Sequence, residues 1–147
     1  MKKIVYVDMD GVIVDFQSGI DALSMAQRLD FKDKYQRCPG IFSLMKPYPG
    51  SIEAMKKMFD VYDLYILSSP GWYNSTAWSD KHAWVVKYLP FMERRLILSS
   101  QKHLNMGDYL IDDRTANGAV EFKGEFVHFG TKEFPHWDGV LSYFGVN

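Results

Sequence analysis

Two pairs of acidic residues stand directly after short apolar runs of this 147-residue chain. They are Asp8 with Asp10, after residues 4–7, and Asp112 with Asp113, after residues 109–111. Carboxylates held close together repel one another, so such groups indicate a bound cation or a basic partner. Arg114 follows the second pair and could be that partner.

The first pair also has simpler explanations. Together with Gly11 it fits an ordinary turn in which an Asp side chain bonds to nearby backbone. It does not fit a calcium-binding loop, because the bidentate Glu of that loop would fall at Gly19. Further acids would also be needed where Val12 and Val14 stand.

Two other apolar runs are followed by groups that could hold a phosphate. Ser68 and Ser69 end the run at residues 64–67, and Lys102 comes shortly after the run at residues 96–98. Hydroxyls and backbone amides of such a turn can donate hydrogen bonds to phosphate oxygens, and a lysine adds positive charge. Taken singly, the serines fit a plain turn and the lysine a solvated side chain.

The strands and helices that must position these groups are predicted from apolar runs and from signals at helix ends. Five apolar runs of strand length lie at residues 4–7, 64–67, 96–98, 109–111 and 126–129. Most lack polar alternation, which favours strands covered on both faces of a parallel sheet. A helix is predicted from Ser51, its candidate N-cap, and another over residues 76–89, ended by Pro90. Strands alternating with helices predict an α/β fold, a doubly wound (Rossmann-like) parallel sheet with the ligand site at the carboxyl ends of its strands.

Length and composition favour one domain over residues 1–147 with a packed core, since 47% of the residues are hydrophobic. Residues 17–47 do not follow the alternation, and we interpret them as a small, partly helical cap inserted after the first strand. The net charge of -1 gives no general attraction to nucleic acid or to anionic membrane. Cys38 is the only cysteine, which excludes an intramolecular disulfide, and we expect it to be buried. No apolar stretch approaches the roughly 20 residues that span a bilayer, so we expect a cytoplasmic protein.

The four polar groups carry more information together than singly. Each follows a successive predicted strand, and parallel strands bring their carboxyl ends to one edge of the sheet. Four carboxylates would meet there, offset by Lys102 and Arg114, so the sequence predicts a bound Mg2+.

In this order the motifs resemble the haloacid dehalogenase-like (HAD) phosphatase superfamily: Asp-x-Asp, a Ser or Thr, a Lys, and a paired acid. Longer stretches are similar to the cytosolic 5′(3′)-deoxyribonucleotidases. They are Asp8-Met9-Asp10-Gly11-Val12-Ile13-Val14-Asp15-Phe16, Ser68-Ser69-Pro70, Lys81-His82-Ala83-Trp84-Val85-Val86-Lys87-Tyr88 and Leu110-Ile111-Asp112-Asp113-Arg114.

The resemblance implies a magnesium-dependent phosphatase of nucleotide metabolism that forms an aspartyl-phosphate intermediate. It makes Asp8 the nucleophile and Asp10 the general acid and base. The other implied roles are phosphate binding by Ser68, Ser69 and Lys102, and Mg2+ binding by Asp8, the Asp10 carbonyl and Asp112, with Asp113 beside the metal.

The resemblance also implies that Phe16, Ile41 and Phe42 bind the substrate, a small phosphomonoester such as a nucleoside monophosphate, and it leaves a homodimer open. Two departures weaken the nucleotide assignment: the cap is shorter than in the animal enzymes, and Ser100 stands where an arginine is expected. A phosphatase for another small phosphomonoester is therefore an alternative. A receiver-type signalling module is a second one, but it would need its phospho-acceptor Asp after the third strand, where Ser99 and Ser100 stand.

Overall fold

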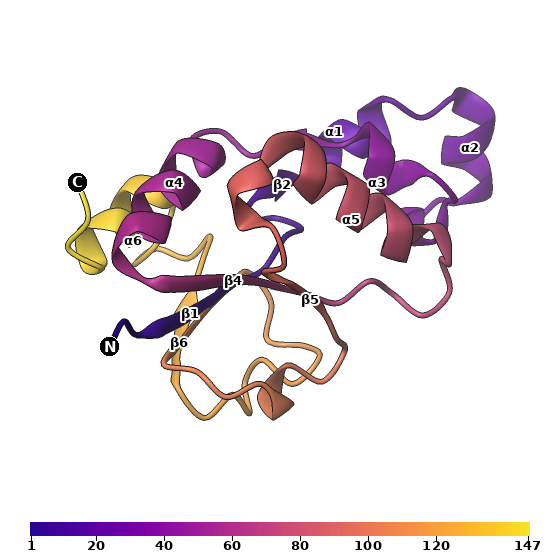
Figure 1. The fold of residues 1–147 in the computed structure, drawn as a ribbon. Coiled ribbons are helices and arrows are strands. Elements are labelled where there is room, and N and C mark those ends of the chain that lie inside the picture. Colours follow the sequence, from indigo (N-terminus) through magenta and orange to yellow (C-terminus); the bar gives the residue numbers. More distant parts are fainter.

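A computed structural model describes all 147 residues, and its centre is a parallel sheet of five strands. The strands are β1 (Ile4–Val7), β4 (Asp63–Ser68), β5 (Leu96–Leu98), β6 (Tyr109–Asp112) and β7 (Glu125–His128), in the order β5-β4-β1-β6-β7 (Figure 1). Each corresponds to one of the predicted apolar runs, and the predicted α/β fold with a Rossmann-like parallel sheet is confirmed.

The central strand β1 contributes to two cores, one on each face of the sheet. Val5 and Val7 are fully buried in the larger core, whereas Tyr6 belongs to a smaller one with Leu110 and Phe122. Successive side chains of a strand point to opposite faces. The continuous apolar run of β1 therefore reflects cover on both sides.

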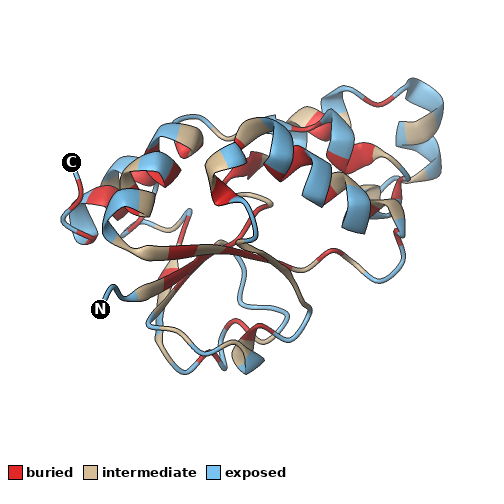
Figure 2. Ribbon diagram, viewed as in Figure 1, coloured by how far each residue is buried: buried red, intermediate tan, exposed pale blue.

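The α-helices lie over one face of the sheet (Figure 1). They include α4 (Ser51–Val61), α5 (Thr76–Tyr88), which Pro90 ends as predicted, and a C-terminal α6 (Trp137–Tyr143) that packs against α4. The other face is covered by shorter connections that contain the 3-10 turn η3 (Lys102–Leu104). Buried residues accordingly gather on the helix surfaces that face the sheet (Figure 2). None of the helices is both long and apolar enough to cross a membrane.

The predicted N-cap role of Ser51 is wrong. α4 begins at Ser51 itself, and the residue at its N-cap is Gly50, in a left-handed conformation with φ of 79°. The Ser51 hydroxyl is buried and donates a hydrogen bond of 2.8 Å to the carbonyl of Ile13. The side chain therefore ties α4 to the chain after β1.

Three short helices and a 3-10 turn fill the segment between β1 and α4. They are α1 (Phe16–Asp21), α2 (Met25–Asp30), η1 (Tyr35–Arg37) and α3 (Ile41–Leu44). The two ends of this segment pair as antiparallel strands β2 (Val14–Asp15) and β3 (Lys46–Pro47). The segment packs on α5 through α3, and the indole of Trp84 donates to the carbonyl of Met45 at 2.9 Å. Cys38 lies buried within it, as expected.

Candidate active site

The carboxyl ends of β1 and β6 bring the two acid pairs together. The two strands pair in parallel with Val7 opposite Ile111, so Asp8 and Asp112 come next to each other at the same edge. The backbone amide of Asp8 donates to the carbonyl of Ile111 at 2.9 Å, which fixes this register. Both side chains are almost fully buried.

Three carboxylates form a compact oxygen cluster at this edge. Asp8, Asp112 and Asp113 each place an oxygen within 4.8 Å of the others. Asp113 Oδ1 is buried without a hydrogen-bond partner. Burial, reinforced by the neighbouring charges of Asp8 and Asp112, raises the pKa of Asp113 to about 8. Three carboxylates this close together, one of them with an unpartnered buried oxygen, fit a hard divalent cation such as Mg2+.

Gly11 makes room for this cluster. It has φ of 81°, and a Cβ at this position would collide with the carboxylate of Asp113. A side chain at position 11 would therefore be strained and would displace Asp113.

Lys102 is the buried countercharge of the cluster. Its Nζ lies 3.0 Å from Asp8 Oδ1 and 2.5 Å from Asp112 Oδ2. Burial alone would lower the pKa of Lys102, but Asp8 and Asp112 hold it above its ordinary value. Burial raises the pKa of Asp8, while the charge of Lys102 opposes that rise. In the sequence Lys102 follows β5, and the fold brings its side chain to Asp8 at the end of β1 and to Asp112 at the end of β6.

Lys81 is a site residue that the sequence analysis did not single out. It is fully buried in α5, and its Nζ lies 3.0 Å from Asp10 Oδ2, 2.7 Å from Ser68 Oγ and 3.0 Å from the carbonyl of Ser69. Burial raises the pKa of Asp10, and the charge of Lys81 opposes this. A signal was present, because position 81 lies one helical turn from Ala77 and Trp84 on the apolar side of the predicted helix.

The two serines after β4 differ in position. Ser68 is fully buried, and its hydroxyl accepts the hydrogen bond from Lys81. Ser69 lines a pocket beside Asp10 and Asp113, and its hydroxyl donates to the carbonyl of Ser99 at 2.9 Å. Ser68 therefore contacts the buried ammonium of Lys81, and Ser69 faces the pocket.

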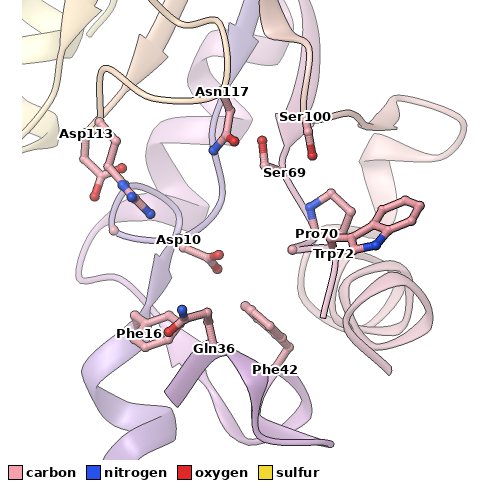
Figure 3. A pocket seen from close by; sticks show the side chains of 13 residues that line it. Asp10, Phe16, Gln36, Phe42, Ser69, Pro70, Trp72, Ser100, Asp113 and Asn117 are labelled. Carbon is pink, nitrogen blue, oxygen red and sulfur yellow. The ribbon is translucent and has the colours of Figure 1, made fainter. Parts of the chain in front are cut away.

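A pocket of about 550 Å³ opens beside the acids, between the sheet edge and the segment after β1 (Figure 3). Phe16 and Phe42 line it as an edge-to-face pair, with ring centroids 6.0 Å apart. Ile41 does not line it, because its side chain is fully buried in the core, and its predicted contact with substrate is not supported by this geometry. A smaller cavity of about 40 Å³ lies against Asp8 and Lys102 and shares Asp10 and Ser69 with the larger pocket.

The fold is HAD-like. A haloacid dehalogenase-like family hydrolase from Streptococcus pneumoniae has a similar solved structure, with a TM-score of 0.56 and 16% sequence identity over 97% of this chain and 90% of its own. The family profile "5′ nucleotidase, deoxy (Pyrimidine), cytosolic type C protein" matches residues 25–142. The chain belongs to this family and is therefore a phosphatase of the 5′-nucleotidase type.

Individual relatives agree with this assignment. A protein of Vibrio phage KVP40, provisionally named a 5′(3′)-deoxyribonucleotidase, is 54% identical over 97% of this chain and 84% of its own length. The human cytosolic-type 5′(3′)-deoxyribonucleotidase is 29% identical over 93% of this chain and 78% of its own. A provisionally named 5′(3′)-deoxyribonucleotidase of Staphylococcus aureus strain Mu50 is 28% identical over 76% of this chain and 74% of its own.

Proposed function

We propose that this chain is a magnesium-dependent hydrolase of nucleoside monophosphates, with deoxyribonucleotides preferred, that works through an aspartyl-phosphate on Asp8. The observation that carries the proposal is the joint position of three carboxylates, two buried lysines and an aromatic-lined pocket at one edge of the sheet. The names of the phage and human relatives support the substrate class.

The first step is attack on phosphorus by a carboxylate oxygen of Asp8. A bond forms between this oxygen and phosphorus, and the bond between phosphorus and the ester oxygen of the substrate breaks. Asp10 gives its proton to the departing oxygen. Lys102, 3.0 Å from Asp8 Oδ1, places positive charge beside the oxygens that gain negative charge in the transition state.

The second step releases phosphate. Asp10, now ionised, takes a proton from a water molecule whose oxygen attacks the phosphorus. The bond to Asp8 breaks and the free carboxylate returns. Burial raises the pKa of Asp10 against the opposing charge of Lys81, and a raised pKa favours the protonated form that the first step needs.

Asp8, Asp112 and Asp113 would hold the metal, together with the carbonyl of Asp10. When bound, Mg2+ supplies positive charge that favours ionised carboxylates and neutralises the approaching phosphate. The unpartnered Oδ1 of Asp113 and the close spacing of the three acids fit this ion. Without such a charge the burial of Asp8 disfavours the ionised form that attacks phosphorus.

Substrate recognition would divide between two regions of the pocket. Ser69 and Lys102 line the smaller cavity, on the side where the phosphate would lie, and Ser68 and Lys81 are buried beside Ser69. Phe16 with Phe42 offers aromatic surface to the base. Stacking of a base on an aromatic side chain contributes about 1 to 3 kcal/mol, which a sugar phosphate does not gain. Phe42 also covers the Lys81 ammonium, at 4.6 Å from the ring centroid.

Three further points belong to the proposal. We place the boundaries of the cap at residues 17–47 within a single domain. We expect action in the cytoplasm, in keeping with the cytosolic type of the human relative. We expect neither a nucleic acid polymer nor a membrane as partner.

The test is phosphate release from a panel of nucleoside, sugar and amino-acid monophosphates, with Mg2+ and with EDTA. We expect a deoxynucleoside monophosphate to give the highest kcat/KM and EDTA to abolish turnover. Asp8→Asn should lower kcat by about a thousandfold or more with an unchanged circular dichroism spectrum, because the amide is not a nucleophile. Asp60→Asn, on the exposed side of α4, is the matched control and should retain full activity. Full activity in EDTA or in Asp8→Asn would refute the mechanism. A higher kcat/KM for a sugar phosphate than for any nucleoside monophosphate would mean that the substrate is a sugar phosphate.

A further inference from the structure

The outer wall of the substrate pocket comes from three loop residues to which the proposed mechanism gives no role. Residues Pro70, Gly71 and Trp72, between β4 and α5, line the pocket together with Gln36 of the segment after β1. Figure 3 shows Pro70 and Trp72 on the side of the pocket across from Asp113. Gly71 has φ of 76°, so the chain turns sharply just before Trp72.

This loop is tied firmly to the neighbouring segment by Asn74, which is 3% exposed. Its Nδ2 donates to the carbonyls of Gln36 and Cys38, each at 3.0 Å. Its Oδ1 accepts from the amide of Thr76 at 3.1 Å and from the Thr76 hydroxyl at 2.7 Å. A buried amide with all of these bonds made holds both walls of the pocket in fixed relation.

A second contact lies beside this one. The guanidinium of Arg37 lies 4.3 Å from the ring centroid of Tyr73. The loop is therefore anchored just after Trp72, at Tyr73 and Asn74, and before it at Ser69, whose carbonyl accepts from Lys81. The indole of Trp72 is free of these contacts.

Trp72 is the most exposed of the four tryptophans in the chain. Trp84 and Trp137 are buried, and each donates its indole N–H to a backbone carbonyl. Trp72 is 84% exposed and makes no hydrogen bond, and its ring extends outward from the rim of the pocket in Figure 3. A large exposed aromatic on the rim of a ligand pocket is surface that a ligand can cover.

We propose that Trp72 is a specificity-determining residue whose indole turns onto the base of the bound nucleotide, opposite Phe16 and Phe42, and that Asn74 is the positioning residue that holds its loop. The inference rests on the proposed function. An exposed side chain changes rotamer within nanoseconds, so the indole can reorient while its loop stays anchored. The base would then lie between the rings of Phe16 and Phe42 on one side and the indole of Trp72 on the other.

The test compares dTMP with glycerol 2-phosphate, which has a phosphate but no base. Trp72→Ala should raise the KM for dTMP about tenfold and leave kcat/KM for glycerol 2-phosphate within twofold. Trp72→Phe should retain most of the affinity for dTMP. Trp78→Ala is the matched control, because Trp78 is 44% exposed and does not line this pocket.

Binding is read directly from tryptophan fluorescence in an Asp8→Asn background with Mg2+. We expect dTMP to change the emission when Trp72 is present and to change it far less in Trp72→Phe. Asn74→Ala should raise the KM for dTMP in the wild-type background and have no further effect on it in Trp72→Ala. A merely structural role of Asn74 would raise KM equally in both backgrounds.

The inference is overturned if Trp72→Ala keeps kcat/KM for dTMP within twofold of wild type, or if it loses activity equally on both substrates. If the wild-type enzyme does not prefer dTMP to glycerol 2-phosphate, the proposed function fails first and the inference falls with it.

Discussion

The buried ion pair of Lys81 and Asp10 allows a sharp test of the site's energetics. Lys81 is fully buried, whereas the Asp10 side chain is 28% exposed. Lys81→Met keeps the length and apolar stem of the side chain but removes the charge that faces Asp10 Oδ2 at 3.0 Å. Ser68 Oγ and the carbonyl of Ser69 lose their donor at the same time.

Breaking a buried ion pair by removing one partner costs about 3 to 5 kcal/mol. Asp10 retains some contact with solvent and can take up a proton, so we expect the lower end, a loss of about 3 kcal/mol in the free energy of unfolding. Asp10→Asn alone should also destabilise, because it leaves the Lys81 charge buried with neutral partners only. The double variant lacks both charges, so its loss should be about 2 kcal/mol smaller than the sum of the single losses.

The assay is urea unfolding followed by circular dichroism, with the same slope required for all variants. Lys87→Met, at an exposed position of the same helix, is the matched control and should change stability by about 0.5 kcal/mol or less. Two results would refute this reasoning: a Lys81→Met protein as stable as Lys87→Met, or single-variant losses that simply add in the double variant.

Three other outcomes are expected. Gly11→Ala should weaken Mg2+ binding at least tenfold, measured by calorimetry, because the new methyl group would collide with the carboxylate of Asp113. An unchanged Mg2+ affinity would show that Asp113 is not displaced or does not bind the metal. Phe16→Ala should lower dTMP turnover while a small aliphatic phosphoester is hydrolysed almost normally, and equal losses would make Phe16 a packing residue. Because the pKa of Asp113 is raised to about 8 in the metal-free fold, its contribution to stability is full below pH 4 and is lost as pH rises toward and through 8. Mg2+ should therefore raise the melting temperature more at pH 8 than at pH 6, and an equal rise at both would count against the carboxylate cluster as the metal site.

The strands and their polar ends could be predicted because both depend on local sequence. The runs at residues 4–7 and 96–98 match β1 and β5 residue for residue. Parallel pairing then brings Asp8 and Asp112 together without further information, since all carboxyl ends meet at one edge.

Lys81 could not be assigned in the same way, because its role depends on tertiary packing. A lysine within an amphipathic helix normally reaches solvent, and only the packing of α5 places this one against Asp10 and Ser68. Ile41 does not line the pocket although its neighbour Phe42 does, because adjacent residues of a helix point in different directions. Its role in substrate binding stays a prediction. Trp72 lies in a loop, where no periodicity indicates which side chain lines a pocket.

The central place of β1 has a consequence for the synthesis of this enzyme. β1 emerges from the ribosome first, but both of its partners in the sheet, β4 and β6, come later in the chain. Asp8 and the Lys102 that neutralises it are separated by 94 residues. A nascent chain in which β6 is still inside the ribosome lacks Asp112 and Asp113, and it lacks one of the two strands that flank β1. Asp8 therefore acquires its neutralising lysine and its neighbouring carboxylates only after the chain has been translated through β6.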